Sequence, residues 1–445
     1  MKYCKRCLYP ANHPYGMIFD KKGICAGCKV HEEKDFLDWD ERFKLLKDIV
    51  KKNNSKFDKS FFDCIVPVTG GGDSYFTVYV VKEKLGLNPL LVNYNHQYNT
   101  HVGIKNLANL TTVFDCELIQ STLSPELVKK ITKHTIKKYG SIYWHVLAGY
   151  TTFPVKVAVR FRIPLIIWGV NPWAEQTGMY SHLDEMEMTE RCRKEHGLMG
   201  ISTKEIFESS SSLSYEDLNE YRYPSDYEIE EIGVRGIYLS NYLRWDSKKQ
   251  HELMIKKYGY ESAAQQRTFN TYEDVHCAHS AGLHDYLKFL KLGYSKVTDH
   301  ATREIRLKRM TREEGIEMVE KYSNIEPKDL ELFLKWIGMN KNEFFEHINK
   351  YRDSSIWYRD NQGNWNLKDS IINHKNDKDI ESVRLKKSED CNFLITQNIN
   401  EFKNNNSYLL MGRSYLDQYN YGALLDRPEG EKISKREWKS PDISK

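Results

Sequence analysis

The sequence lacks any long apolar run and any strong excess of one charge. Among its 445 residues, no uninterrupted apolar segment approaches the roughly 18 residues that a membrane-spanning helix needs. The first residues, Met1 to Cys4, contain no apolar stretch typical of a secretory signal. The net charge of +4 is small for a dedicated nucleic-acid-binding protein. We therefore expect a soluble, cytoplasmic protein whose partner is neither a membrane nor a nucleic acid.

The sequence gives no reason to expect disulfide bonds, although it contains nine cysteines. In a reducing compartment, clustered cysteines point to metal binding. Two CxxC pairs are separated by 17 residues, and their members are Cys4, Cys7, Cys25 and Cys28. This spacing is typical of a zinc ribbon, in which four thiolates hold a structural Zn²⁺ that supplies the folding energy of a small module. The alternatives are four unrelated buried cysteines or a redox CxxC pair.

A glycine run, Gly70–Gly72, follows a short apolar segment over Phe62–Val68 that reads as a buried strand. From Asp73 to about Leu85 the spacing is helical. A strand that turns through glycines into a helix lets backbone N–H groups converge on an anion. The run has neither the Gly-Lys-Ser/Thr ending of a Walker loop nor the spaced glycines of a dinucleotide fingerprint. The alternative is an ordinary glycine turn in an α/β domain.

Strands and helices alternate from about residue 46 to residue 170. Further strands are predicted at Asn88–Tyr94, Cys116–Gln120 and Ile163–Gly169, and helices over about 103–114, from Ser124 onward and over about 145–162. This alternation predicts an α/β fold with a doubly wound parallel sheet. Asn93, Asn95 and Gly169 lie at strand ends, where open sheets bind ligands.

Changes in composition and residue pattern divide the chain into regions. We expect a zinc-ribbon module over residues 1–45, an α/β domain over 46–320 and a helical C-terminal region over 321–445. Residues 173–235 lose the strand–helix rhythm and are either an insertion that covers the substrate or a plain surface insertion. A helix is predicted over Asn241–Tyr258 and a helical pair over 325–350. Beyond about residue 370 the composition turns polar, and no chemistry is assigned there.

Two further groups of residues are candidates for a site. On a helix, Asp299, Arg303 and Arg306 fall on one face, which is either functional or a solvated salt-bridged face. A capping box at Thr311–Glu314 starts another helix. His276, Cys277 and His279 are candidate ligands of a second metal, but no fourth ligand is spaced to complete a tetrahedral site.

The glycine run with its neighbours resembles the Ser-Gly-Gly-x-Asp-Ser loop of the PP-loop ATP pyrophosphatases, with Thr69 in the serine position and Gly72 where lysine is common. With the cysteine pairs, the chain is similar to the N-acetyl sugar amidotransferases of lipopolysaccharide and nonulosonic-acid biosynthesis. The resemblance covers roughly residues 1–370. It is carried also by Gly236–Leu239 with Trp245-Asp246, and by the run from Gly282 through Thr298-Asp299-His300 to Arg312.

The resemblance implies a PP-loop (HUP-like) fold and an enzyme that uses ATP and Mg²⁺ to convert an acetamido group of an N-acetyl sugar into an acetamidino group, releasing AMP and pyrophosphate. ATP would be bound by Thr69, Gly70, Gly71, Gly72, Asp73 and Ser74, with Asn93, Asn95 and Gly169. Asp73 is the candidate ligand of Mg²⁺. Arg303 and Arg306 would stabilise developing charge, and Asp299 and His300 would serve proton transfer.

The source of ammonia is expected to lie outside this chain. The residue after Met1 is Lys2 rather than the cysteine of one glutaminase class, and no cysteine has the Gly-x-Cys-x-Gly neighbours of the other. We expect a separate glutaminase partner or free ammonia. Two alternatives stay open: a tRNA-thiolating PP-loop enzyme using Cys116, Cys192 or Cys277, and a non-catalytic zinc-ribbon adaptor with a degenerate nucleotide fold.

Overall fold

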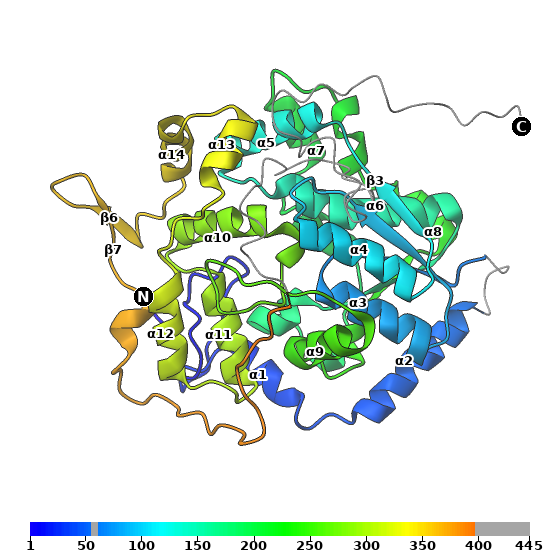
Figure 1. The fold of residues 1–445 in the computed structure, drawn as a ribbon, viewed down its shortest axis with the longest axis horizontal. Helices are drawn as coiled ribbons and strands as arrows, with labels where there is room; N and C mark the ends of the chain where they lie inside the picture. Colours follow the sequence, from blue (N-terminus) through cyan, green and yellow to red (C-terminus); the bar gives the residue numbers. More distant parts are fainter. Residues whose placement is uncertain (55–60, 397–445) are drawn as a thin grey trace, which may run out of the picture.

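A five-stranded parallel sheet lies at the centre of the molecule (Figure 1). The structure is a computed structural model that describes residues 1–54 and 61–396. The strands, in the spatial order β3-β2-β1-β4-β5, are β1 (Cys64–Pro67), β2 (Pro89–Tyr94), β3 (Leu118–Ser121), β4 (Leu165–Trp168) and β5 (Arg235–Tyr238). The strand order reverses between β1 and β4, and ligands of open α/β sheets bind outside the carboxyl ends of strands at such a reversal. The glycine run follows β1 at this position.

Helices cover both faces of the sheet, so the predicted doubly wound α/β fold is confirmed. Val66 of β1 packs in one apolar cluster with helices α3, α4 and α9, whereas its neighbour Ile65 packs in another with α6 and α8. These helices are α3 (Gly72–Tyr79), α4 (His101–Val113), α6 (Trp144–Phe161), α8 (Asp226–Ile232) and α9 (Ser247–Tyr258). Helix α5 (Pro125–Tyr139) joins β3 to α6. Strands buried on both faces read as near-continuous apolar runs, which is why the sequence revealed them.

Two elements differ from the sequence-based predictions. Helix α9 begins at Ser247 and not at Asn241, because the side chain of Asp246 caps it by accepting the backbone N–H of Lys249. Residues Leu239–Asn241 form a separate 3₁₀ turn. Strand β5 was not predicted as a strand, since its four residues show neither a long apolar run nor a clear alternation.

The stretch 173–235 departs from the strand–helix rhythm, as predicted. It contains helices α7 (Thr203–Glu208) and α8, and the short turns η2 (Trp173–Thr177), η3 (His182–Asp184), η4 (Cys192–Gly197) and η5 (Glu216–Tyr221). Leu218 and Tyr221 of η5 pack against Trp144 of α6. The stretch therefore has its own contacts with the α/β core, and its role as a substrate cover stays a prediction.

The N-terminal cysteines lie in a small module that packs on two helices from much later in the chain. Residues 1–37 contain helix α1 (Ala26–Glu33) and two isolated β-bridges. The module shares an apolar cluster with α11 (Lys296–Arg306) and α12 (Arg312–Tyr322). Helix α2 (Trp39–Asn54) then leads into the α/β unit. This packing ties the cysteines to the helix that carries Asp299, Arg303 and Arg306.

The C-terminal region is helical, as predicted. Its described part contains α13 (Leu330–Ile337) and α14 (Lys341–Asn349), followed by the hairpin β6 (Trp357–Arg359) and β7 (Trp365–Leu367) and the turn η8 (Ile371–His374). Helix α10 (Ala278–Leu292) lies before this region in the chain and packs against it. Leu287, Phe333 and Phe344 share one apolar cluster. In the described part of the chain, no helix combines the length and apolar character that crossing a membrane requires.

Residues 379–396, called the strap below, run back along the molecule after the hairpin (orange to red in Figure 1). The backbone N–H of Glu381 donates to the carbonyl of Lys5 at 3.0 Å, and that of Lys386 donates to the carbonyl of Lys308 at 2.9 Å. The strap thus joins the cysteine module to the end of α11. Residues 397–445, which hold most of the predicted polar extension and its basic tail, lie outside the described residues.

Candidate functional site

The glycine loop between β1 and α3 is held by its own hydroxyl groups. The backbone N–H of Thr69 donates to the Oγ of Ser74 at 2.8 Å, and the N–H of Gly71 donates to the Oγ1 of Thr69 at 3.1 Å. These bonds fix the turn from strand to helix. The first backbone N–H groups of α3 have no carbonyl partner within the helix and carry its positive end.

The loop accepts only glycine because other elements press against it. A Cβ at Gly70 would lie 2.1 Å from the carbonyl oxygen of Gly103 in α4. A Cβ at Gly72 would lie 2.7 Å from the ring of His251 in α9. His251 therefore fills the space that a side chain at position 72 would need, which explains why no lysine stands there. Backbone N–H groups at the start of a helix suit the outer phosphates of a nucleotide.

Asp73 is the first acidic residue of α3 and is oriented by a histidine. Its Oδ1 lies 2.8 Å from the Nε2 of His251, whose side chain is 1% exposed. The Asp73 side chain is 38% exposed, and its second oxygen has no partner among the described residues. A carboxylate with one oxygen anchored and one available, beside a phosphate-binding loop, suits a Mg²⁺ ligand.

A cavity of about 140 Å³ lies at the carboxyl edge of the sheet in front of Asp73. It brings together every predicted catalytic residue, although they come from α3 and α11. Its charged lining includes Asp73, Glu273, Lys296, Asp299, His300, Arg303 and Arg306. Carboxylates and cations thus meet in one enclosed space, where electrostatic interactions are stronger than in water.

One wall of the cavity is an ionic cluster around Glu273. This carboxylate pairs with Arg303, and its Oε2 lies 3.2 Å from the Nε2 of His300. Burial raises the pKa of Glu273, but the charges of Arg303 and His300 outweigh it and hold the pKa well below its usual range. The Nδ1 of His300 lies 2.7 Å from the Oγ1 of Thr268. The contact to Thr268 fixes the orientation of the His300 ring, and Nε2 is left without a hydrogen bond among the described residues although Glu273 lies close to it.

Asp299 keeps one oxygen available in the same cavity. Its Oδ2 accepts a hydrogen bond from Lys288 at 2.5 Å, whereas its Oδ1 is buried without a partner among the described residues. Burial raises the pKa of Asp299, but Lys288 outweighs it, so that the pKa lies below its ordinary value and the group is ionised at neutral pH. Asp299 can therefore accept a hydrogen bond from a bound amine or amide.

Lys296, at the start of α11, adds a second cation to this wall. It pairs with Asp274, and burial lowers its pKa. Asp274 itself has a left-handed backbone conformation, with φ of 56°. The residue lies beside Glu273, so the turn that carries both carboxylates is shaped to face α11.

Arg306 lies at the border between the cavity and the cysteine module. Its Nη1 donates to the carbonyls of Glu175 and Gln176 at 2.7 and 2.9 Å, and its Nη2 lies 3.5 Å from the Sγ of Cys25. Most of its donors are therefore used in joining α11 to η2 and to the cysteines. Arg303 is the more available cation for a reacting group.

The predicted nucleotide-binding residues beyond the loop have identifiable structural contacts. Asn93 donates from Nδ2 to the carbonyl of Val68 at 2.7 Å, which ties β2 to the start of the glycine loop. The Oδ1 of Asn95 accepts the N–H of Gln97 at 3.0 Å. A Cβ at Gly169 would lie 2.9 Å from the Oγ1 of Thr77. All three shape the edge of the sheet, and their role toward a nucleotide stays a prediction.

The four N-terminal cysteines form a buried cluster whose sulfur atoms all lie within 4.8 Å of one another. The Sγ atoms of Cys7 and Cys25 are 3.6 Å apart. A tetrahedral zinc ion with bonds of about 2.3 Å separates its sulfur ligands by roughly 3.8 Å, so this spacing fits. The backbone N–H groups of Cys7 and Cys25 also point at the Sγ of Cys4, as donors to a thiolate do. The cluster can therefore hold the predicted zinc ion.

The candidate second metal site has a different composition from the predicted one. His96, His276 and Cys277 form a group with ligand atoms within 4.8 Å of one another, whereas His279 pairs with Asp329 at 3.2 Å. However, the Nδ1 of His96 accepts the backbone N–H of Tyr98 at 3.0 Å. A neutral His96 then carries its proton on Nε2, the opposite of what a metal ligand needs. The group is better described as a buried polar cluster behind the glycine loop.

Sequence reasoning missed His251, Glu273, Lys296 and Lys288. Each lies far along the chain from the glycine loop, and no short motif marks it. The only available signal was proximity to the run around Thr298–Arg306, which the resemblance had already singled out.

Comparison with known proteins finds a similarity for the segment that carries one wall of this cavity. Residues 266–371 match the family described as LPS biosynthesis protein WbpG-like, C-terminal domain. A protein of Methanocaldococcus jannaschii, described as uncharacterized, is 27% identical over 118 residues, which cover 26% of this chain and 41% of that protein. The chain thus matches less than half of the length of this relative. Among solved structures, NMN synthetase from Francisella tularensis aligns with a TM-score of 0.26 and 11% identity, over 52% of this chain and 98% of that one.

Proposed function

We propose that this chain is an ATP-dependent amidotransferase of surface glycan biosynthesis, which converts an acetamido group of an N-acetyl sugar into an acetamidino group. One observation carries the proposal. The cavity in front of the glycine loop is walled on one side by Asp73 of α3 and on the other by Glu273, Lys296, Asp299 and Arg303. The second wall falls within residues 266–371, the segment similar to a lipopolysaccharide biosynthesis domain.

The proposed chemistry activates an unreactive carbonyl. An amide carbonyl is a poor electrophile, and its oxygen is a poor leaving group. The amide oxygen attacks the α-phosphorus of ATP, and the bond to pyrophosphate breaks. Ammonia then forms a C–N bond with the activated carbon, and the C–O bond breaks, so that the former amide oxygen leaves on AMP. The net products are the amidine, AMP and pyrophosphate.

In this proposal the glycine loop binds the outer phosphates of ATP. The N–H groups at the start of α3, with the Thr69 and Ser74 hydroxyls that shape the loop, would hold the pyrophosphate end. Asp73 would hold Mg²⁺ with the oxygen that His251 leaves available. The magnesium ion would neutralise phosphate charge.

The opposite wall is proposed to orient the amide and to hold charge. Arg303 would face negative charge that develops on the transferred phosphate. The available Oδ1 of Asp299 would accept a hydrogen bond from the attacking amine, and the ionised Asp299 and Glu273 suit the positive amidinium product. His300 would help to place Glu273 through the charge contact between them, while Thr268 fixes the orientation of its ring.

The source of ammonia and the tRNA-thiolating alternative both concern this cavity. Among the described residues that line it, none is a cysteine. A thiolation mechanism that depends on a cysteine in the cavity is therefore not favoured. We propose that ammonia comes from a separate glutaminase or from free ammonium.

The test is mass spectrometry of N-acetyl sugars incubated with the full chain, ATP, Mg²⁺ and ammonium. Replacement of oxygen by NH lowers the sugar mass by about one dalton, and one AMP appears per amidine formed (about 1:1, since one adenylyl group is transferred per turnover). Asp73→Asn should reduce both signals about 100–1000-fold, whereas Asp48→Asn, at an exposed acid on α2, should leave them unchanged. Release of ADP in place of AMP would refute the proposal.

A further inference from the structure

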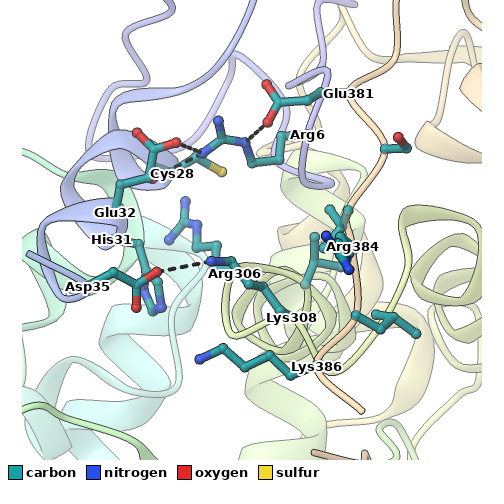
Figure 2. A pocket seen from close by; sticks show the side chains of 14 residues that line it. Arg6, Cys28, His31, Glu32, Asp35, Arg306, Lys308, Glu381, Arg384 and Lys386 are labelled. Carbon is teal, nitrogen blue, oxygen red and sulfur yellow. Dashed lines mark hydrogen bonds and ion pairs between the residues drawn. The ribbon is translucent and has the colours of Figure 1, made fainter.

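A second cavity, of about 380 Å³, lies between the cysteine module, the end of α11 and the strap. Figure 2 shows its lining, with His31, Glu32 and Asp35 on one side and Arg384 and Lys386 of the strap on the other. His31 and Arg306 line both this cavity and the one in front of Asp73. The two cavities are therefore neighbours that share a wall.

Several charged groups of this second cavity are already paired. Arg6 pairs with Glu32 at 2.6 Å and with Glu381 at 2.7 Å, and Lys308 pairs with Asp35 at 3.0 Å. Arg306 also faces Cys25, whose thiolate would share the negative charge of a zinc–cysteine cluster. Arg6 and Lys308 therefore bring no uncompensated charge to the cavity, and of the Arg306 donors only Nε is without a partner among the described residues.

The strap supplies cations that have no such partner. The side chains of Arg384 and Lys386 form no ion pair or hydrogen bond with any residue in the described ranges, and both line the cavity. They therefore carry two uncompensated positive charges to its rim. Charge of one sign on the rim of a hollow raises the local concentration of oppositely charged ligands.

Two buried side-chain nitrogens belong to residues that line the same cavity. The Nε2 of His31 has no partner among the described residues, although the residue is only 7% exposed. The Nε of Arg306 is likewise buried without a partner in the part of the chain that the structure describes. A buried polar nitrogen without a partner is costly, and it marks a place where a ligand or water completes the hydrogen bond. The two cations at the rim and the two buried nitrogens inside make this cavity suitable for binding an anion.

We propose that this cavity binds a phosphate group at a site separate from the glycine loop, with Arg384 and Lys386 neutralising its charge and His31 and Arg306 donating hydrogen bonds to its oxygens. The choice of phosphate over other anions rests on the proposed function. Its reaction releases pyrophosphate and AMP in the adjoining cavity, and the sugar substrate is a second source if it carries phosphate. The probes below separate these sources.

The test is isothermal titration of the full-length protein with sodium pyrophosphate, in the presence of saturating α,β-methylene-ATP to occupy the glycine loop. The unmodified protein should retain a pyrophosphate site. In Arg384→Ala/Lys386→Ala its affinity should fall roughly tenfold, as expected for the loss of two exposed charge contacts. The matched control, Lys378→Ala/Lys387→Ala, removes the same charge at one residue just before the strap and one within it, neither of which lines the cavity, and should leave the affinity unchanged.

Competition by AMP and by UDP-N-acetylglucosamine then identifies the source, because a reaction product and a diphosphate-linked sugar should displace pyrophosphate to different extents. An equal loss of affinity in both double variants, or no pyrophosphate site once the loop is occupied, would overturn the inference. Failure of the proposed function has a different signature, since the methylene analogue would then not bind while the strap variant still weakened pyrophosphate binding.

Discussion

The two walls of the candidate catalytic cavity in front of Asp73 are built in different ways. The glycine loop consists of consecutive residues, Thr69 to Ser74. Its backbone is positioned by hydrogen bonds to hydroxyl groups and by close packing. The opposite wall is held by pairs of charged side chains, in which Arg303 pairs with Glu273 and Lys288 pairs with Asp299. The first depends on shape within a few residues, and the second on contacts between distant parts of the chain. The comparison predicts that the loop fails through steric change and the wall through charge change.

The largest effect is expected from a methyl group in the loop. Gly70→Ala places a Cβ 2.1 Å from the carbonyl oxygen of Gly103, so the loop or α4 must shift. We expect ATP binding, measured by titration calorimetry, to fall more than about 100-fold, with a stability loss of roughly 1–3 kcal/mol or more. Gly282→Ala is the matched control, because its nearest atom is 3.7 Å away, and it should bind ATP normally. Normal binding by both variants would show that the loop is not sterically closed.

The second-largest effect is expected at Asp73, where a substitution can remove the negative charge and keep the shape of the side chain. Asp73→Asn keeps the size of the side chain but removes the carboxylate that faces the cavity. AMP formation should fall about 10²–10³-fold, as when one electrostatic contact to the reacting group is lost, while ATP affinity changes little. His251→Phe, which keeps the ring against Gly72 but removes the contact to Asp73, should give a smaller loss. Equal losses in the two variants would mean that Asp73 acts only through its orientation.

A smaller effect distinguishes the two arginines of α11. Arg303→Lys weakens the pairing with Glu273 and should reduce AMP formation roughly 10–100-fold without loss of zinc, because a lysine cannot reproduce the planar fork. Arg306→Lys removes contacts to two carbonyls and to Cys25. It should lower the melting temperature and the zinc content measured by mass spectrometry. If Arg306→Lys reduced turnover while zinc content and melting stayed normal, Arg306 would belong to the reacting group's surroundings after all.

The contrast between local residue patterns and contacts across the chain also explains which features could be predicted from the sequence. The glycine loop, the cysteine pairs and the buried strands follow from local residue patterns, and the fold class was predicted from them. The gathering of Asp299, His300, Arg303 and Arg306 at Asp73 rested on resemblance, since helical spacing alone fitted a solvated face equally well. Glu273 and His251 were missed because their roles arise from ion pairs across about 30 and 178 positions of chain, which no local pattern encodes.

The smallest expected effect is a pH dependence that belongs to the side-chain wall. Burial lowers the pKa of His300 below its ordinary value of 6.5, so the unfolded chain takes up this proton first and stability falls as the pH drops below about 6.5. The pKa of Glu273 is also held low, so its contribution is present above about pH 4.5 and is lost only as the pH falls further. In urea unfolding at constant ionic strength, His300→Gln should flatten the decline between roughly pH 6.5 and 5, at up to about 1.4 kcal/mol per pH unit, whereas Glu273→Gln should flatten it only below about pH 4.5. Curves for both variants that run parallel to that of the unmodified protein would mean that this wall holds together by packing, as the glycine loop does, and the contrast between the two walls would be lost.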